Sequence, residues 1–225
     1  FETYLYISKN KSQIFVYDKN NLKNLYNEEI KTSEENDLNY LSKFLDENIY
    51  KIEKMINNFI RNIILILEDD KVLHTSISLK KKNYEKSNSQ KYLENSLVEV
   101  KDIFRENYQD HIIMHMIISD SVKNENNDLL NNPNNNNDYL FLEVNFISIS
   151  NKFTLYFEKM LENHQIKIRR YMSGNYIKGY LGEGSTKLSV MANKLNKGLN
   201  KNEVQLVSKS IENRGFFERF FHLFS

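Results

Sequence analysis

The chain has 225 residues and contains no cysteine, no tryptophan, one proline and six glycines. The absence of cysteine excludes a disulfide-stapled secreted scaffold and any cysteine-ligated metal site. Hydrophobic residues make up 40% of the sequence, which is enough for a packed core and excludes a disordered or collagen-like chain. The length fits one globular domain or two small ones.

Neither sign of charge dominates, because 31 Lys and Arg residues stand against 30 Asp and Glu residues, for a net charge of +1. This balance excludes binding to nucleic acid or anionic lipid through net charge, so any such contact must come from a local patch of charge. The longest apolar run, residues 63–67, is far shorter than the roughly 18 residues of a membrane-spanning helix. No signal-peptide pattern opens the chain, so we expect a cytosolic protein, with a few residues preceding Phe1 because no methionine starts it.

The first third of the sequence predicts a sheet covered by a helix. Residues 4–7 and 13–17 are rich in aromatic and β-branched residues and flank a polar turn, which predicts a β-hairpin. Apolar residues then recur at spacings of three and four from residue 38 to 59, which is typical of a long amphipathic helix. Residues 61–67 predict a buried strand and residues 72–79 an alternating one.

The rest of the chain continues to mix helices and strands. The predicted helices cover residues 92–104, 153–163 (with Ser150 or Asn151 as N-cap), 175–181 and 188–195, and the predicted strands cover residues 111–118, 139–150, 166–172 and 204–207. An Asn-rich loop of low complexity, residues 124–138, separates two of these strands. The pattern predicts an α+β fold.

The patterns that carry metal, phosphate or nucleophile chemistry are missing. His111 and His115 lie four residues apart on a predicted strand, about 13 Å at roughly 3.3 Å per residue, so they cannot ligate one ion and are expected to be surface or half-buried histidines. The one glycine cluster, residues 179–184, follows no strong strand and precedes no Lys-Ser/Thr pair, which indicates a helix end and a loop. A Gly-x-Ser-x-Gly motif is absent and no pair of acids stands out. The sequence therefore predicts no catalytic, cofactor-binding or metal-binding residue, and no enzyme.

Two short basic runs, residues 80–82 and 167–170, are the local patches of positive charge. The first predicts a solvated loop and the second the outer face of an edge strand, and neither is interleaved with the aromatic residues that nucleic-acid binding requires. Strand 139–150 is expected to offer an edge for strand addition by a partner. The predicted partner-binding residues are Lys167, Arg169, Arg170, Leu142 and Val144.

The last eleven residues, 215–225, form the most amphipathic segment of the chain. Five of ten consecutive residues are phenylalanine, and at about 100° per residue the apolar side chains fall within an arc of about 160° while the polar ones occupy the opposite arc. Two interpretations stay open: a final helix docked on the core or on a sister chain, and an interfacial helix in a membrane surface, which the aromatic content favours. Such attachment would be hydrophobic, and one short helix binds weakly, so stable recruitment requires several copies. The predicted membrane-binding residues are Phe216, Phe217, Phe220, Phe221, Leu223 and Phe224.

These parts, in this order, resemble the FtsA family of bacterial actin-like cell-division proteins, in particular its inserted SHS2-type (1C) subdomain and its membrane-targeting tail. The matching segments are Ser76-Ile77-Ser78-Leu79, the helix of residues 93–104, His115-Met116-Ile117-Ile118, the Asn132-Pro133 turn that leads into Leu140-Phe141-Leu142-Glu143-Val144, the helix that ends at Asn163, Gln165-Ile166-Lys167-Ile168, Ser173-Gly174-Asn175-Tyr176, and residues 215–224. The resemblance covers roughly residues 72–181 and 213–225.

The sequence departs from this family where nucleotide would bind. Actin-like ATPases have an Asp-x-Gly phosphate loop between their first two strands, but the hairpin here reads Tyr6-Ile7-Ser8-Lys9-Asn10-Lys11. A second phosphate loop, expected after Leu181, is missing, and 225 residues are too few for the four-subdomain actin-like fold. The resemblance therefore implies a reduced FtsA-like protein without nucleotide binding, and a residual ATPase is the disfavoured alternative.

The resemblance implies an α/β sandwich in which an SHS2-like strand-helix-strand-strand unit joins a remnant of an actin-like sheet, with a C-terminal amphipathic helix. The expected boundaries are 1–70 for the sheet remnant, 71–184 for the SHS2-like unit, 185–213 for a helix and linker, and 214–225 for the membrane-targeting helix. The implied function is a non-enzymatic adaptor of the division machinery, peripheral on the inner face of the cytoplasmic membrane. It would bind division proteins or another copy of itself, and neither nucleic acid nor nucleotide. The alternative is a soluble structural or pilus-assembly-type interaction module whose Phe-rich tail packs in its core or in a dimer interface.

Overall fold

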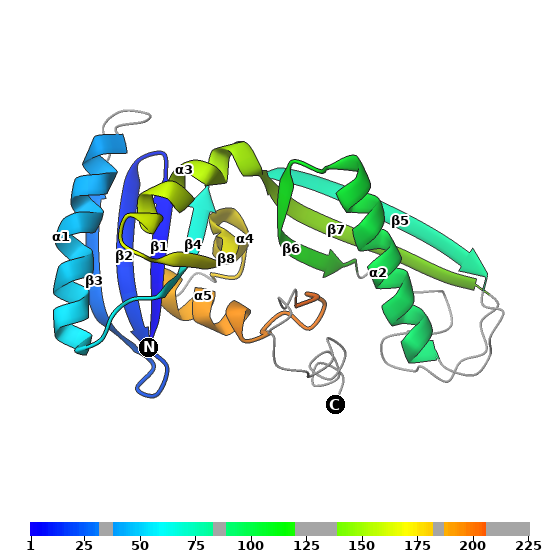
Figure 1. Cartoon of the computed structure of the whole chain (residues 1–225). Coiled ribbons are helices and arrows are strands. Elements are labelled where there is room, and N and C mark those ends of the chain that lie inside the picture. The colour runs from blue at the N-terminus through cyan, green and yellow to red at the C-terminus, as the bar shows by residue number, and fades with distance from the viewer. Residues whose placement is uncertain (32–37, 83–88, 120–138, 182–186, 206–225) are drawn as a thin grey trace. The chain divides into compact units, whose positions relative to one another are not determined.

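The computed structural model describes residues 1–31, 38–82, 89–119, 139–181 and 187–205 (Figure 1). The chain forms two compact units, one made of residues 1–72 and 149–199, and the other made of residues 73–148 and 200–225. Residues 73–148 of the second unit are thus inserted between the two parts of the first, and its remaining part follows residue 199. The architecture is mixed α+β with two sheets, which confirms the predicted fold class.

The first unit is built on a five-stranded sheet in the order β3-β2-β1-β4-β8. Strands β1, β2 and β3 are antiparallel neighbours, whereas β4 and β8 run parallel to β1. The strands are β1 (Glu2–Ser8), β2 (Lys11–Asp18), β3 (Lys23–Lys31), β4 (Asn62–Glu68) and β8 (Lys167–Ser173), and the helices are α1 (Leu38–Ile56), α3 (Asn151–Glu162), α4 (Gly174–Gly179) and α5 (Leu188–Asn196).

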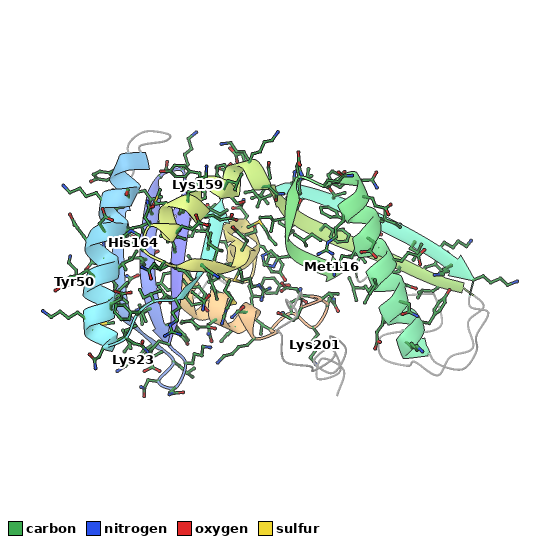
Figure 2. All side chains as sticks on the ribbon, in the orientation of Figure 1. Lys23, Tyr50, Met116, Lys159, His164 and Lys201 are labelled. Atoms are coloured by element: carbon green, nitrogen blue, oxygen red, sulfur yellow. The ribbon has the colours of Figure 1, made fainter. Side chains whose placement is uncertain are left out.

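Successive side chains of a strand point to opposite faces of the sheet, and helices cover both faces here. One face carries Tyr4, Tyr6 and Ile66, which form a buried cluster with residues of α4 and α5. Helix α1 packs on β2 and β3, and α3 packs on β8. Tyr50, labelled in Figure 2, lies on the outer side of α1 and is 68% exposed.

The second unit is a three-stranded sheet in the order β5-β7-β6 with one long helix on it. Its elements are β5 (Leu73–Lys82), α2 (Ser89–Asn107), β6 (His111–Ile118) and β7 (Tyr139–Ser150), whose last two residues belong to the first unit. Phe104 of α2 stacks on Phe146 of β7, with ring centroids 4.5 Å apart, at the centre of this unit's core. Among the helices that the structure describes, none has the length and apolarity needed to cross a membrane.

Most elements lie where the sequence predicts them, and β6 and β7 have the predicted bounds. The basic residues 80–82, predicted to form a loop, are instead the end of β5. Strand β3 was not predicted, because its residues are half-buried or exposed and its sequence is polar. The described residues of the predicted strand 204–207, 204 and 205, form no strand; an isolated bridge pairs Ile117 with Glu203, the residue before them, and residues 206 and 207 lie outside the described residues.

The predicted domain boundary at residue 184 is not where the structure divides the chain. Residues 149–181 lie with the first unit, because β8 pairs with β4 and α3 packs on β8. Residues 200–205 in turn lie with the second unit, where Val204 N–H donates to Met116 O at 2.8 Å. The sequence order of elements does not reveal this exchange, because it results from long-range strand pairing.

Candidate functional site

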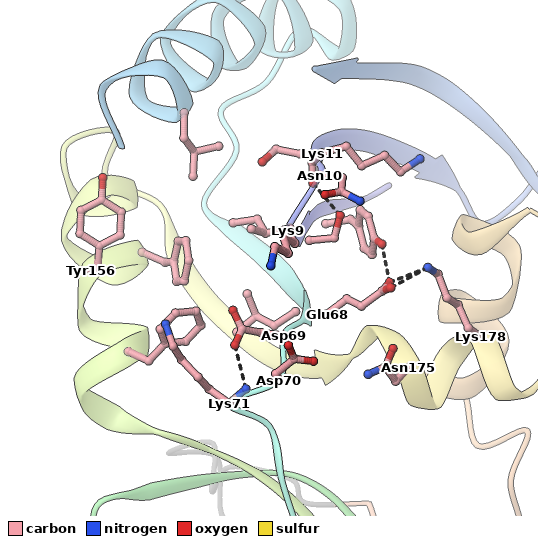
Figure 3. A pocket seen from close by; sticks show the side chains of 18 of the residues that line it. Lys9, Asn10, Lys11, Glu68, Asp69, Asp70, Lys71, Tyr156, Asn175 and Lys178 are labelled. Atoms are coloured by element: carbon pink, nitrogen blue, oxygen red, sulfur yellow. Dashed lines mark hydrogen bonds and ion pairs between the residues drawn. The ribbon is translucent and has the colours of Figure 1, made fainter. Parts of the chain in front are cut away.

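The carboxyl ends of the parallel strands β1 and β4 open into a cleft of about 800 Å³ within the first unit (Figure 3). Open α/β sheets commonly bind their ligands at this edge, where strand ends, loops and helix termini meet. The cleft is lined by the β1–β2 hairpin, the end of β4 and the turn after it, the first turns of α3, and α4, with Leu41 of α1. All of these elements belong to one unit.

A three-residue cluster forms one end of the cleft. The Tyr6 hydroxyl donates to Glu68 Oε2, and Lys178 Nζ lies 2.8 Å from Glu68 Oε1 and 2.7 Å from Oε2. Burial raises the pKa of Glu68, but the hydrogen bonds from Lys178 and Tyr6 outweigh it and hold that pKa below its ordinary value. Burial and the Glu68 carboxylate raise the pKa of Tyr6. The cluster is therefore an ionised carboxylate held between an ammonium group and a neutral phenol.

Gly174 allows α4 to start close enough to β4 for this cluster to form. A Cβ atom at Gly174 would lie 2.8 Å from Glu68 Cβ, closer than such atoms approach in proteins. Ser173 then caps the helix, because its side chain accepts a hydrogen bond from Tyr176 N–H at 3.3 Å. One turn further on, Lys178 faces Glu68 (Figure 3).

The α3 side of the cleft is an aromatic wall. The rings of Phe153 and Phe157 meet edge to face at 5.4 Å, and those of Tyr156 and Phe157 at 5.5 Å. Lys71 Nζ lies 4.6 Å from the centroid of the Phe153 ring, within the range of a cation–π contact. This wall can hold an apolar or aromatic group of a ligand.

The rim of the cleft has a surplus of positive charge. Five lysines, Lys9, Lys11, Lys71, Lys152 and Lys178, stand against the three acids Glu68, Asp69 and Asp70. Lys178 holds Glu68, and Asp69 Oδ1 accepts from the Lys71 backbone N–H at 2.8 Å, which closes the turn after β4. The cleft therefore favours ligands that carry apolar groups next to negative charge.

The predicted partner-binding residues are not brought together. Leu142 and Val144 are 2% and 0% exposed in the core of the second unit, so their side chains cannot contact a partner. The prediction that their strand is an edge is wrong, because β7 lies between β5 and β6.

Lys167, Arg169 and Arg170 do lie on an edge strand, β8, as predicted for their strand. Arg169 Nη2 binds Glu2 Oε1 at 2.8 Å, and Arg170 Nη1 donates to Asn196 Oδ1 at 2.9 Å. These two guanidinium groups therefore contribute to the packing of the first unit. Lys167 is exposed at the start of the strand.

The histidines were predicted to be at the surface or half-buried, and this is wrong for His115. It is 1% exposed, and its Nδ1 shares a hydrogen bond of 2.8 Å with Oε1 of the equally buried Glu203. Within the described ranges no group of three or more His, Cys, Asp or Glu side chains is arranged to hold a metal ion. The predicted membrane-binding residues 216–224 lie outside the described residues.

The sequence does not reveal the cleft, because residues 6–11 are predicted only as part of a hairpin that departs from a phosphate loop. The strands that end at Ser8, Glu68 and Ser173 are parallel neighbours, and the ends of such strands meet at one edge of a sheet. Only strand order identifies these neighbours, and the sequence alone does not supply it.

No family model matches the sequence, and no curated protein matches it. The solved structures that are similar to the chain include the following three. The cytoplasmic domain of EpsL, an inner membrane component of the type II secretion system of Vibrio cholerae, has 8% identity and a TM-score of 0.39 over 81% of this chain and 58% of that one. The PilM–PilN type IV pilus biogenesis complex has 10% identity and a TM-score of 0.49, and the match covers 80% of this chain and 49% of that one. A Bacteroides thetaiotaomicron protein with an actin-like ATPase fold has 13% identity and a TM-score of 0.31, and the match covers 80% of this chain and 55% of that one.

The chain spans about half the length of these three structures. One of the three is named as having an actin-like ATPase fold, and the fold class of this chain is given by its own two sheets. These likenesses concern fold alone and do not extend to cell division. With TM-scores below 0.5, they carry no inference about function.

The hairpin and the end of β4, which face the cleft, are held by contacts within the chain. The hairpin presents Lys9 and Asn10 at its tip, and Ser8 Oγ donates to Lys11 O at 3.1 Å, which closes that turn. The carboxylate at the end of β4, Glu68, is already bound by Tyr6 and Lys178.

Proposed function

We propose that the chain is a non-enzymatic interaction module of the pilus-assembly type, which binds a segment of another protein in the cleft of its first unit. The observation that carries this proposal is the composition of the cleft: an aromatic wall on α3 faces a rim with more lysines than acids. The cleft supports the binding of a protein segment, and the pilus-assembly type is the alternative that the sequence leaves open; two of the similar structures are named as parts of membrane machines.

The expected ligand follows from the same residues. Phe153 and Phe157 offer a surface for an aromatic or aliphatic anchor, and the lysines around it favour Asp or Glu next to that anchor. The Glu68 cluster at the other end is already paired, so it shapes the cleft without attracting a cation. A short amphipathic segment with acidic flanks meets these requirements.

Selection of 12-residue peptides on the full chain tests this function. Enriched peptides are expected to combine aromatic or aliphatic residues with Asp or Glu, and K71E is expected to weaken their binding about tenfold, or about 1.4 kcal/mol, because it reverses a charge against the aromatic wall. F153A should weaken binding by a similar factor, since it removes the anchor surface. Isothermal titration calorimetry measures both.

The matched control is K51E, because Lys51 is an exposed lysine on α1 that does not line the cleft. Its binding should equal that of the unmodified chain. Selected peptides that bind K71E and F153A as tightly as the unmodified chain would contradict the proposed site. Measurable hydrolysis of ATP by the full chain would contradict the proposal that the chain is not an enzyme.

We also propose that residues 215–225 tether the chain to the inner face of the cytoplasmic membrane. The Phe-rich apolar arc of this segment supports the tether, because aromatic side chains are favoured at the lipid–water interface. The FtsA resemblance implies a more specific function, an adaptor of the division machinery. Such an adaptor has the same membrane tether as the interaction module proposed above but binds a different protein, so the identity of the bound partner distinguishes the two functions.

Flotation with liposomes tests the tether. The full chain is expected to float with the vesicles, whereas removal of residues 215–225 abolishes flotation. A double change F220S and F221S should reduce flotation strongly, because it removes apolar area from the interfacial face. The control E218Q and R219Q changes only the polar face and should leave flotation unchanged. Equal flotation of the full and shortened chains would refute the tether.

A further inference from the structure

Strand β5 forms one edge of the sheet of the second unit, since among the described strands it pairs only with β7. Its pairing with β7 is regular over ten residue pairs, from Leu73–Ser148 to Lys82–Tyr139, with no shift in register. Long, regular edges offer unpaired backbone groups to other strands, and proteins usually protect them with charges, bulges or a covering segment.

The other sheet edges of the described chain carry such protection. Strand β8 presents three basic residues and has a register shift against β4, and β3 has four charged residues and a shift in its pairing with β2. The outer edge of β6 is covered by residues 202–204, through hydrogen bonds of 2.9 Å from Ile118 N–H to Asn202 O and of 2.8 Å from Val204 N–H to Met116 O.

Residues 73–79 of β5 carry none of these devices. The stretch Leu-His-Thr-Ser-Ile-Ser-Leu contains no Lys, Arg, Asp, Glu or Pro, and charge enters only with the lysines at 80–82. Along it, half-buried residues alternate with exposed ones. Ile77 and Leu79 face the core under α2 but remain only partly buried, as expected at an open edge. A further strand would bury both.

We propose that β5 pairs antiparallel with β5 of a second copy of this chain, about a two-fold axis at Ser76. In this register the charge-poor stretch pairs with itself: Leu73 faces Leu79 of the second copy, and Thr75 faces Ile77. Residues that face each other then lie on the same side of the joined sheet, so the apolar faces under the two α2 helices become continuous. The β5 edge does not line the cleft, and the proposed pairing does not depend on the function proposed for the cleft.

The position of the lysines selects this orientation. In the antiparallel register, residue 80 of one copy faces residue 72 of the other, so the two Lys80 residues lie about 25 Å apart along the strands. Parallel pairing would place the lysines at 80–82 of both copies side by side, which like-charge repulsion opposes. The same lysines limit the joined segment to the charge-poor stretch.

Single cysteines report this register directly, because the chain has no cysteine of its own. In the full chain, S76C is expected to form a disulfide-linked dimer with oxidised glutathione, since facing residues of adjacent strands lie about 4.5–5.5 Å apart between Cα atoms, within disulfide range. The matched control is S78C, on the same exposed face of the same strand. Its two copies would lie about 13 Å apart and stay unlinked. A mixture of H74C and S78C should yield the mixed dimer.

Sedimentation of cysteine-free chains gives an independent test. S76K and S76E are each expected to weaken dimerisation by roughly fivefold, and an equimolar mixture of the two should restore it, because opposite charges then face each other at the axis. Equal disulfide linkage of S76C and S78C would overturn the proposal. A chain that stays monomeric at every concentration, and whose S76C variant forms no linked dimer, would overturn it too. A dimer that S76K leaves unchanged would overturn it as well, because its interface would lie elsewhere.

Discussion

Substitution of His115 by alanine is expected to lower the free energy of unfolding of the second unit by about 3 kcal/mol, because it breaks a fully buried pair. The side chains of His115 and Glu203 are both 0% exposed, and their Nδ1 and Oε1 atoms are 2.8 Å apart. The substitution leaves the Glu203 carboxylate in the interior without this imidazole. Urea denaturation of the full chain, followed by probes in each unit, measures the loss.

The same pair holds residues 200–205 against β6, so the loss has a local signature. In the variant, the amide of Val204, which donates to Met116 O, should exchange with deuterium much faster than in the unmodified chain. The control is H164A, because His164 and Asp46 form a similar pair of 3.1 Å in which Asp46 is 61% exposed. Exposed pairs contribute at most about 1 kcal/mol. Equal destabilisation by H115A and H164A would contradict the prediction.

Substitution of Glu2 by glutamine is expected to destabilise the first unit by about 3 kcal/mol at pH 7. Glu2 is 7% exposed, and its carboxylate binds five side chains of that unit. These are Lys19 and Arg169 at 2.8 Å each, the Tyr4 hydroxyl at 2.7 Å, Asn193 at 2.9 Å and Asn196 at 3.3 Å. The carboxylate thereby connects β1 to β8 and α5.

The effect should depend on pH in a defined direction. Burial raises the pKa of Glu2, but hydrogen bonds from Lys19, Arg169 and Tyr4 outweigh it and lower the pKa from 4.5 to about 2. A group whose pKa is lower in the folded state contributes its full stability above its unfolded pKa and loses it as the pH falls toward the folded one. The difference between the unmodified chain and E2Q should therefore be constant above about pH 5 and shrink steadily from pH 4.5 toward pH 2.

Urea denaturation at several pH values measures this difference, and E29Q is the control. Glu29 forms an exposed ion pair of 3.0 Å with Lys11, in which the side chains are 46% and 39% exposed. Its substitution should change stability by less than about 1 kcal/mol at any of these pH values. An E2Q difference that stays constant down to pH 2 would show that the Glu2 carboxylate is not held in its ionised form.

The local elements could be predicted from the sequence because each has a strong periodic pattern. The alternation of β7 and the three- and four-residue spacing of α1 follow directly from the side chains that face the core. Strand β3 could not be predicted in this way. It lies at the edge of the sheet, and its polar side chains, such as Glu28 and Glu29, face solvent. Pairing with β2 defines it, and a pairing partner is not visible in the strand's own sequence.

The sites were less predictable than the elements, because they are formed by residues distant in the sequence. Lys178 reaches Glu68 across 110 positions, and His115 reaches Glu203 across 88. The arginines of β8 look like a surface patch in the sequence. In the structure Arg169 and Arg170 are bound by Glu2 and Asn196.

The sequence by itself determined the α+β class, most strands and helices, and the amphipathic character of residues 215–225, because these depend on composition and on spacing along the chain. The tertiary structure alone decided which strands are neighbours. Through strand pairing, residues 149–199 belong to the first unit, and the ends of β1 and β4 meet at a cleft. In the other sheet, β7 lies in the middle and β5 at the edge. The physical reason is that strand pairing satisfies backbone groups between segments far apart in sequence, and local side-chain patterns do not specify the partner.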